Sequence, residues 1–445
     1  MRTEFTRLTV VGASRKAELV VPNDESVGAL IPRLMDLLEE KAGSVARPLT
    51  LVRSTGEQLD ASLSPAEQQV TDGELLRLVR QDEAPPPPEV ADVTDVLADS
   101  HADRRGLWSD TFREATGAVG IGGLSLAAAW SAAGADAADL LVWVLAALVV
   151  VAVIAGRMRA RWVTHAGTAA AAGVSLPLAV ALSDDFTGGA LADAPAGAAV
   201  AFTALLAAAL AQGVLALGLG VGRGRRPALS GGLLGVALSA LPLLVARLGV
   251  GATEALAIGG VVAAVVCGLI PWYAMSVSGL TGLDDQVVEG RQRRRDSVLL
   301  TVNGAYRTLS WCAFAVAAPL AACASALTVS LDVWAASLGV AIAAITALRT
   351  RAFPLAAQAM ALWAAAGIVV LAGITGSPML PRGAEVPLLA GAALVTAVLV
   401  GVRPAQHQRA SLRRLGNFME ALAVIALLPL LLGVFDVYTD LLGAF

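Results

Sequence analysis

The chain has 445 residues, of which 56% are hydrophobic and 15% are charged, and its formal net charge is -4. This composition excludes an ordinary soluble enzyme and is typical of a polytopic membrane protein, because each helical span needs about 20 predominantly apolar residues. The only lysines are Lys16 and Lys41, whereas the apolar part of the chain carries arginine at its loop ends. This pattern indicates membrane topology, and we expect no nucleic-acid partner.

Residues 1–82 predict a small α+β domain. A hairpin signal, Gly12-Ala13-Ser14-Arg15, separates two β-rich runs, and apolar residues at helical spacing follow. Leu34 lies near the middle of the apolar face of that helix and is expected in the core. Two further strands complete the order β-β-α-β-β. The expected elements are strands Phe5–Val11 and Lys16–Val21, a helix Val27–Leu38, and strands Leu49–Arg53 and Leu75–Val79.

This order of elements resembles the ubiquitin-like (β-grasp) fold. The stretches Thr55–Leu59 and Thr71–Leu75 look much like the second half of ubiquitin. After Val79-Arg80, however, the chain continues as Gln81-Asp82-Glu83, without the diglycine tail that conjugation requires. We therefore interpret this head as a docking module and not as a protein tag. A passive folded cap is the alternative.

Residues 83–114 are expected to form a cytoplasmic linker. Pro85–Pro88 predicts a stiff extended spacer. The acidic stretch Glu89–Ser100 has apolar residues spaced for one helical face, so it forms either a short docking helix or a solvated tether. Arg104, Arg105 and Arg113 place the approach to the first span on the cytoplasmic side.

Residues 115–445 predict an all-α membrane domain of about eleven transmembrane helices. The length and apolarity of each run are the basis for this number. The predicted spans are Ala115–Ala133, Leu140–Gly156, Val163–Leu182, Gly197–Val221, Leu229–Ala246, Ala255–Tyr273, Leu309–Leu327, Val333–Leu348, Pro354–Ile374, Val386–Val402 and Phe418–Phe435.

The arginines predict the orientation of these spans in the cell membrane. The densest positive cluster, Glu289–Asp296, reads Glu-Gly-Arg-Gln-Arg-Arg-Arg-Asp and lies between the sixth and seventh predicted spans. Arginines beside a span stay on the cytoplasmic side. We therefore predict a cytoplasmic N-terminus and an extracytoplasmic C-terminus. Arginine-bearing loops alternate in agreement with this orientation at residues 157–161, 223–226, 279–298, 349–351 and 403–414.

Polar residues are sparse inside the predicted spans. No Asp, Glu, Lys or Arg lies near the middle of a span, where ion-coupled transporters normally place ionisable groups. Gln212 and Gln358 are interpreted as interhelical hydrogen-bonding residues. A small-molecule permease with a regulatory head is therefore disfavoured, although it remains the alternative function. Four spans contain a proline that marks either a broken helix at a transport site or a kink tolerated by packing: Pro177, Pro242, Pro319 and Pro429.

Two pairs of glycines have the spacing of helix-packing motifs. Gly218 and Gly222, and likewise Gly231 and Gly235, place small residues four positions apart, which lets helix backbones approach closely. The chain contains 44 glycines, so each pair alone could also arise by chance. We interpret these four residues as candidate helix-packing positions.

No catalytic or metal-binding constellation is expected. His101, His165 and His407 lie far apart in the sequence and lack ligand-spaced neighbours, so we expect no zinc site. No predicted span contains the Ser–His pair of a membrane serine protease, and no phosphate-binding Gly–Lys loop is present. We expect no cofactor and no enzymatic activity. The cysteines Cys267, Cys312 and Cys323 fall in predicted spans, and no disulfide is expected.

The whole chain resembles the EccD family, the multi-spanning membrane component of the actinobacterial type VII (ESX) secretion machinery. The resemblance is carried by Thr6–Gly12, by Leu75, Arg77 and Leu78, and by the long loop from Gly279 to Asp296. It implies a non-enzymatic scaffold that surrounds a channel and pairs with a second copy of itself. It also implies that the head contacts the FtsK/SpoIIIE-type ATPase EccC, with EccB and EccE as further subunits and WXG-type proteins as indirect substrates.

The arginine-rich loop has two interpretations. It is either a topology signal held at the lipid headgroups or a docking surface for a cytoplasmic partner. Its length, its apolar residues beside Asp284 and Asp285, and a charge beyond that of the other cytoplasmic loops favour docking. The candidate docking residues are Leu280, Leu283, Arg291, Arg293, Arg294 and Arg295.

Overall fold

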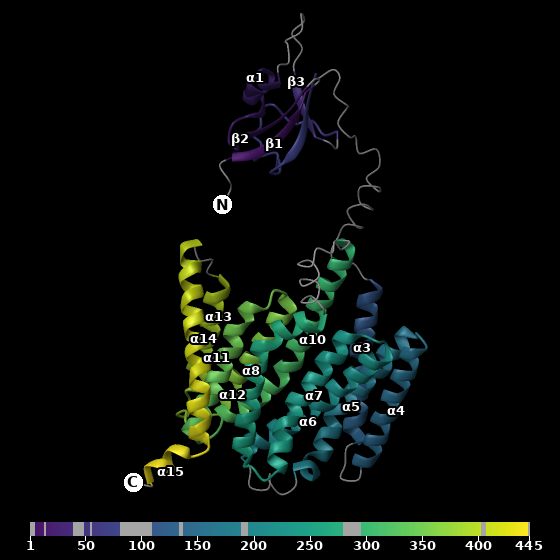
Figure 1. Ribbon diagram of the computed structural model, residues 1–445, viewed down its shortest axis with the longest axis vertical. Coiled ribbons are helices and arrows are strands. Elements are labelled where there is room, and N and C mark those ends of the chain that lie inside the picture. Colours follow the sequence, from purple (N-terminus) through teal and green to yellow (C-terminus); the bar gives the residue numbers. More distant parts are fainter. Residues whose placement is uncertain are drawn as a thin grey trace, which may run out of the picture. The chain divides into compact units, whose positions relative to one another are not determined.

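A computed structural model describes residues 5–12, 15–38, 49–53, 56–80, 109–132, 137–187, 195–278, 295–401 and 406–443. The chain divides into two compact units, Met1–Leu107 and Trp108–Phe445 (Figure 1). The first unit contains the predicted head, and the second contains the predicted membrane helices.

In the residues that the structure describes, the head is a four-stranded mixed sheet with one α-helix. The strands lie in the order β2-β1-β4-β3, with β1 antiparallel to β2, parallel to β4, and β4 antiparallel to β3. The parallel pairing of the first and last strands is the β-grasp arrangement, so the predicted fold class is confirmed. The elements are β1 Phe5–Val11, β2 Lys16–Pro22, α1 Val27–Leu38, β3 Leu49–Arg53 and β4 Glu74–Arg80.

The core of the head lies between α1 and one face of the sheet. Leu34 is 1% exposed and belongs to this core, as the spacing of the helix predicts. Leu38, Leu51 and Leu76 are buried around it. Gly73 precedes β4 with a φ of +84°, and its amide donates to the carbonyl of Arg7 at 2.8 Å. This left-handed turn favours glycine and brings β4 alongside β1.

The second unit is a bundle of long helices (Figure 1). Among the described residues, ten helices are long and apolar enough to cross a membrane, with α6 and the π-helical η1 forming one span. The helices are α3 Asp110–Ala132, α4 Ala138–Arg157, α5 Arg161–Thr187, α6 Ala196–Leu215, η1 Ala216–Gly222, α7 Arg226–Arg247, α8 Ala252–Ser278, α10 Arg295–Thr328, α11 Val333–Arg349, η2 Thr350–Ala352, α12 Ala356–Gly376, α13 Glu385–Gly401, α14 Gln406–Val434 and α15 Val437–Gly443.

The number of spans is close to the predicted eleven. The difference is α13, whose apolar part, Glu385–Val398, is shorter than the other ten spans. Several boundaries also differ from the sequence prediction; α14, for example, begins at Gln406 and not at Phe418. α10 begins at Arg295, well before Leu309, because polar residues continue a helix that hydropathy alone would end at the membrane surface. A short helix, α15, follows the last predicted span.

α10 occupies the centre of the bundle. It packs against α6, α7, α8, α11 and α12. In its most apolar stretch 61% of the residues are buried, compared with 6% in that of α3. The four prolines Pro177, Pro242, Pro319 and Pro429 lie inside helices that continue through them. They therefore do not break these spans.

Candidate functional sites

The sheet of the head has one face that α1 leaves uncovered. Phe5, Val20 and Leu75 are 55%, 57% and 40% exposed on this face. The strand register places Val20 opposite Arg7, and β4 pairs with β1 so that Leu75 and Arg77 lie on the same side. Both arginines are exposed. We call these five residues the open-face patch: Phe5, Arg7, Val20, Leu75 and Arg77.

Sequence reasoning interpreted the head as a docking module but did not identify this patch. The alternation of side chains along β1 and β2 predicts which residues share a face. It does not predict which face the helix covers, because both faces carry apolar residues. The buried cluster that joins α1 to Leu8, Val10 and Leu76 settles that question.

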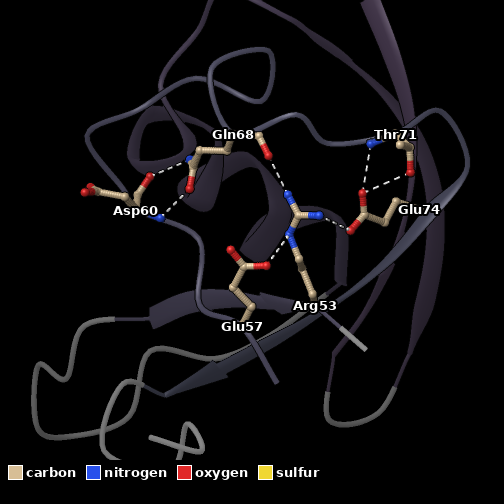
Figure 2. A network of polar contacts seen from close by, with 6 residues as sticks. All are labelled: Arg53, Glu57, Asp60, Gln68, Thr71 and Glu74. Atoms are coloured by element: carbon tan, nitrogen blue, oxygen red, sulfur yellow. Dashed lines mark hydrogen bonds and ion pairs between the residues drawn. The ribbon is translucent and has the colours of Figure 1, made fainter. Parts of the chain in front are cut away.

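A polar network fixes the irregular segment before β4 (Figure 2). Arg53 forms ion pairs with Glu57 at 3.3 Å and with Glu74 at 3.1 Å, and donates to the carbonyl of Gln68 at 2.5 Å. The side-chain amide of Gln68 donates to the carbonyl of Asp60 at 2.9 Å, and its oxygen accepts from the amide of Asp60 at 2.7 Å. The network ties this segment to β3 and β4, so its role is structural.

Two exposed carboxylates cap turns in the same segment. Asp60 accepts hydrogen bonds from the hydroxyl of Ser62 at 2.6 Å and from its amide at 2.8 Å. Glu67 accepts from the amide of Ser64 at 2.8 Å and from its hydroxyl at 2.9 Å. The Ser62 hydroxyl and the Ser64 amide contribute most to holding the pKa values of these two carboxyls below their ordinary values of 3.8 and 4.5.

The four predicted packing glycines all lie where helices approach each other closely. A Cβ on Gly231 would lie 2.6 Å from the Cβ of Trp311 in α10, and one on Gly222 would lie 3.1 Å from the Cα of Val153 in α4. A Cβ on Gly218 would overlap Thr168 of α5. A Cβ on Gly235 would overlap the side chain of Gln212 in α6. We propose that these glycines are required for the packing of α4, α5, α6, α7 and α10.

The two glutamines of the spans bind neighbouring helices. The amide of Gln212 donates to the carbonyl of Ala315 in α10 at 3.2 Å. The amide of Gln358, in α12, donates to the hydroxyl of Ser310 in α10 at 2.9 Å and to the carbonyl of Tyr306 at 3.4 Å. The prediction of interhelical hydrogen bonds is therefore confirmed for both residues.

Two charged clusters lie at the ends of the spans. In the first, the Nδ1 of His165 lies 3.1 Å from a carboxylate oxygen of Glu114, and its Nε2 contacts the guanidinium of Arg223. In the second, Glu420 pairs with Arg349 at 3.4 Å and with Arg351 at 3.3 Å, which joins α14 to the end of α11. Neither cluster was predicted, because the residues that pair in each lie more than fifty positions apart in the sequence.

The first cluster borders a pocket between α3 and α5. The pocket has a volume of about 210 Å³, and Arg113, Glu114, Gly117, Trp162 and His165 are among the residues that line it. Four span ends meet near it, because α3 and α5 begin there, η1 ends there and α7 starts after the turn.

Several predicted residues fall outside the description of the structure. Leu280, Leu283, Arg291, Arg293 and Arg294 lie outside the described residues, and Arg295 is placed only as the first residue of α10. The docking interpretation of this loop therefore remains a prediction. His101 and the side chain of His407 are likewise not described. Within the described residues, no group of three His, Cys, Asp or Glu side chains could hold a metal ion. Cys267, Cys312 and Cys323 are free and buried.

The fold and its sites define a polytopic membrane protein with a ubiquitin-like head. The EccD-like transmembrane domain family matches residues 113–444, and the YukD family of the WXG100 protein secretion system matches residues 5–78. Because the first match covers well over half of the chain, the chain belongs to the EccD family.

Solved structures also resemble the chain. Protomer 1 of the ESX-3 core complex has a TM-score of 0.55 and 19% sequence identity, and the match covers 98% of this chain and all of that one. A chain of the MycP5-free ESX-5 inner membrane complex, State II, has a TM-score of 0.49 and 17% identity, with 90% and 99% covered. No curated protein matches.

Proposed function

We propose that this chain is a non-enzymatic membrane subunit of a type VII (ESX) secretion complex. One observation carries the proposal: a single chain joins an EccD-like transmembrane domain to a head of the YukD family, whose description names a WXG100 secretion system. The likeness to a protomer of the ESX-3 core complex extends over nearly the whole chain and supports a common fold. WXG-type proteins would be its indirect substrates.

The head docks the cytoplasmic EccC-type ATPase through its open-face patch. Val20 and Leu75 provide exposed apolar surface, and Arg7 and Arg77 provide positive charge beside it. Apolar surface combined with arginine is typical of the centre of protein interfaces. The ATPase supplies the energy for secretion, while this chain anchors the ATPase at the membrane.

The membrane unit pairs with a second copy and contacts other subunits such as EccB and EccE. Its peripheral helices expose large side chains, including Leu124, Trp143 and Val386 at 74%, 75% and 73%. Either lipid or another membrane protein must cover these surfaces. The proposed orientation puts the N-terminus in the cytoplasm and the C-terminus outside, because the arginine-bearing loops alternate in this sense.

Copurification of the full-length tagged protein with the ATPase tests the proposal. Val20→Asp places a negative charge in the open-face patch, on the edge strand β2 opposite Arg7, and we expect this variant to lose copurification with the ATPase and to stop secretion. Leu37→Asp is the matched control, because Leu37 is 53% exposed but lies on α1. Normal copurification of the Val20→Asp variant would contradict docking through this patch.

A second variant tests the arginine-rich loop. Changing Arg291, Arg293, Arg294 and Arg295 to Gln should leave membrane levels and self-pairing intact, because other arginine-bearing loops also set the orientation. We expect loss of the cytoplasmic partner on native gels and loss of secretion. Normal secretion by this variant would reduce the loop to a topology signal. A wild-type protein that purifies alone and transports a small molecule would instead support the permease.

A further inference from the structure

The pocket between α3 and α5 lies at the membrane surface. The apolar spans of these helices begin at Phe112 and Arg161, and the neighbouring spans end at Gly222 and begin at Arg226. Trp162 lines the pocket and is 72% exposed, as is typical of an aromatic side chain at the interface between headgroups and acyl chains. The pocket therefore opens at the depth of the lipid headgroups.

Positive side chains outnumber negative ones around the pocket. Arg113 pairs with Asp110 at 3.0 Å, and Glu114 pairs with His165, which in turn contacts Arg223. Both carboxylates, those of Asp110 and Glu114, therefore already have a partner. When Nδ1 of His165 donates its proton to Glu114, Nε2 is left to accept from Arg223, so the imidazole is neutral and the charge of Glu114 offsets that of Arg223.

Three further arginines are left in excess. Within the part of the chain that the structure describes, no carboxylate pairs with Arg161, Arg225 or Arg307. Burial, followed by the charges of Arg223, Arg307 and Arg161, lowers the pKa of the Arg225 guanidinium. The guanidinium remains charged at neutral pH, since arginine is effectively always protonated in proteins. Like charges held together in this way favour the binding of an anion.

We infer that this pocket, with Arg161, Arg223 and Arg225 at its edge, binds the headgroup of an anionic phospholipid. The guanidinium groups would bind the phosphate through paired hydrogen bonds, and the acyl chains would lie along the apolar surfaces of α3 and α5. Basic pockets between transmembrane helices are suited to such headgroups. The bound lipid would hold α3, which is the least buried of the ten long spans, against its neighbours.

Native mass spectrometry of the full-length protein, titrated with phosphatidylglycerol or phosphatidylcholine, tests this site. We expect phosphatidylglycerol to bind the wild-type protein preferentially. The double variant Arg223→Gln with Arg225→Gln should weaken phosphatidylglycerol binding about tenfold, or ~1.4 kcal/mol, and leave phosphatidylcholine binding unchanged. The matched control is Arg413→Gln with Arg414→Gln, which removes the same charge from exposed positions on α14. It should retain the affinity of the wild type.

A second variant keeps the test decisive if the arginine variant does not fold. Trp162→Ala removes an exposed wall of the pocket without changing its charge, and it should also weaken phosphatidylglycerol binding. Unchanged binding in both variants would overturn the proposal. Displacement of the lipid by millimolar inorganic phosphate would overturn it as well, because the site would then recognise free phosphate and not a lipid.

Discussion

The head and the membrane unit bury different kinds of side chain. In the head, large aliphatic residues such as Leu34, Leu51 and Leu76 are at most 1% exposed. In the membrane unit, buried alanines and cysteines are packed among large residues such as Phe202 and Leu205, and Gln358 is fully buried. Other large residues lie on its outer surface, such as Trp143, which is 75% exposed.

The surrounding solvent explains this contrast. Water drives the apolar side chains of the head inward, so removal of apolar surface from water stabilises its fold. A bilayer gives no such drive, because lipid tails are as apolar as leucine. Close approach of helix backbones at small residues and interhelical hydrogen bonds therefore become the main determinants of packing. Removing buried apolar atoms should therefore lower the stability of the head most, while adding a methyl group at a close helix contact should lower the stability of the membrane unit.

The largest expected difference between the two units is their accessibility from outside the cell. We expect a membrane-impermeant maleimide to label Asp185→Cys and Ala444→Cys but not Ser62→Cys, in a background without the native cysteines. The reason is that the alternating arginine loops place the head in the cytoplasm. Labelling of Ala444→Cys from the cytoplasmic side alone would show that the number of spans is wrong by one.

The next largest effect concerns the core of the head. Leu34→Ala should lower the free energy of unfolding of the isolated head, residues 1–82, by about 2–5 kcal/mol, because it removes a fully buried side chain. Denaturant unfolding measures this change. Leu37→Ala on the same helix is the control, and since Leu37 is 53% exposed its effect should stay within about 0.5 kcal/mol. Equal effects would mean that the helix face is assigned incorrectly.

Adding a methyl group should have the corresponding effect in the membrane unit. Gly231→Ala places a Cβ 2.6 Å from that of Trp311 and 2.8 Å from its backbone carbon, so α7 and α10 must move apart. We expect a loss of about 1–3 kcal/mol, measured as a lower thermal midpoint of the full-length protein in detergent. Gly304→Ala, in α10, is the control because no atom lies within 4 Å of its added Cβ. An unchanged midpoint for Gly231→Ala would contradict the packing proposal.

The smallest expected effect is the response of the head to acid. The folded-state pKa values of Asp60 and Glu67 lie below 3.8 and 4.5, so their contribution to stability is present above those values and is lost as the pH falls through the lowered ones. The thermal midpoint of the head should therefore fall on acidification. Asp60→Asn with Glu67→Gln should make this slope shallower, whereas Asp36→Asn, at an exposed position on α1, should not. Identical slopes would show that the turn-capping bonds do not contribute.

Local patterns in the sequence were enough to predict the class of the protein and most of its elements. Strand alternation and helix periodicity in the head predicted each strand and helix to within a residue or two, and the lengths of the apolar runs predicted the spans. These patterns are local, so they can be interpreted without knowing which residues come into contact in the folded protein. The sequence could not show that α10 continues N-terminally through its polar residues to Arg295, because hydropathy reports only the part of a helix that lies in lipid.

The sequence did not predict which faces and helices meet, because these contacts form only on folding. Most of the spans are apolar on all sides, so no amphipathic pattern indicates which face of α10 points inward or that Gly235 lies against Gln212. The parallel pairing of β1 with β4 and the contact of Glu114 with His165 likewise join residues that are distant in the chain. The open-face patch and the arginine-bordered pocket follow from these long-range contacts, since each combines side chains from elements that only folding brings together.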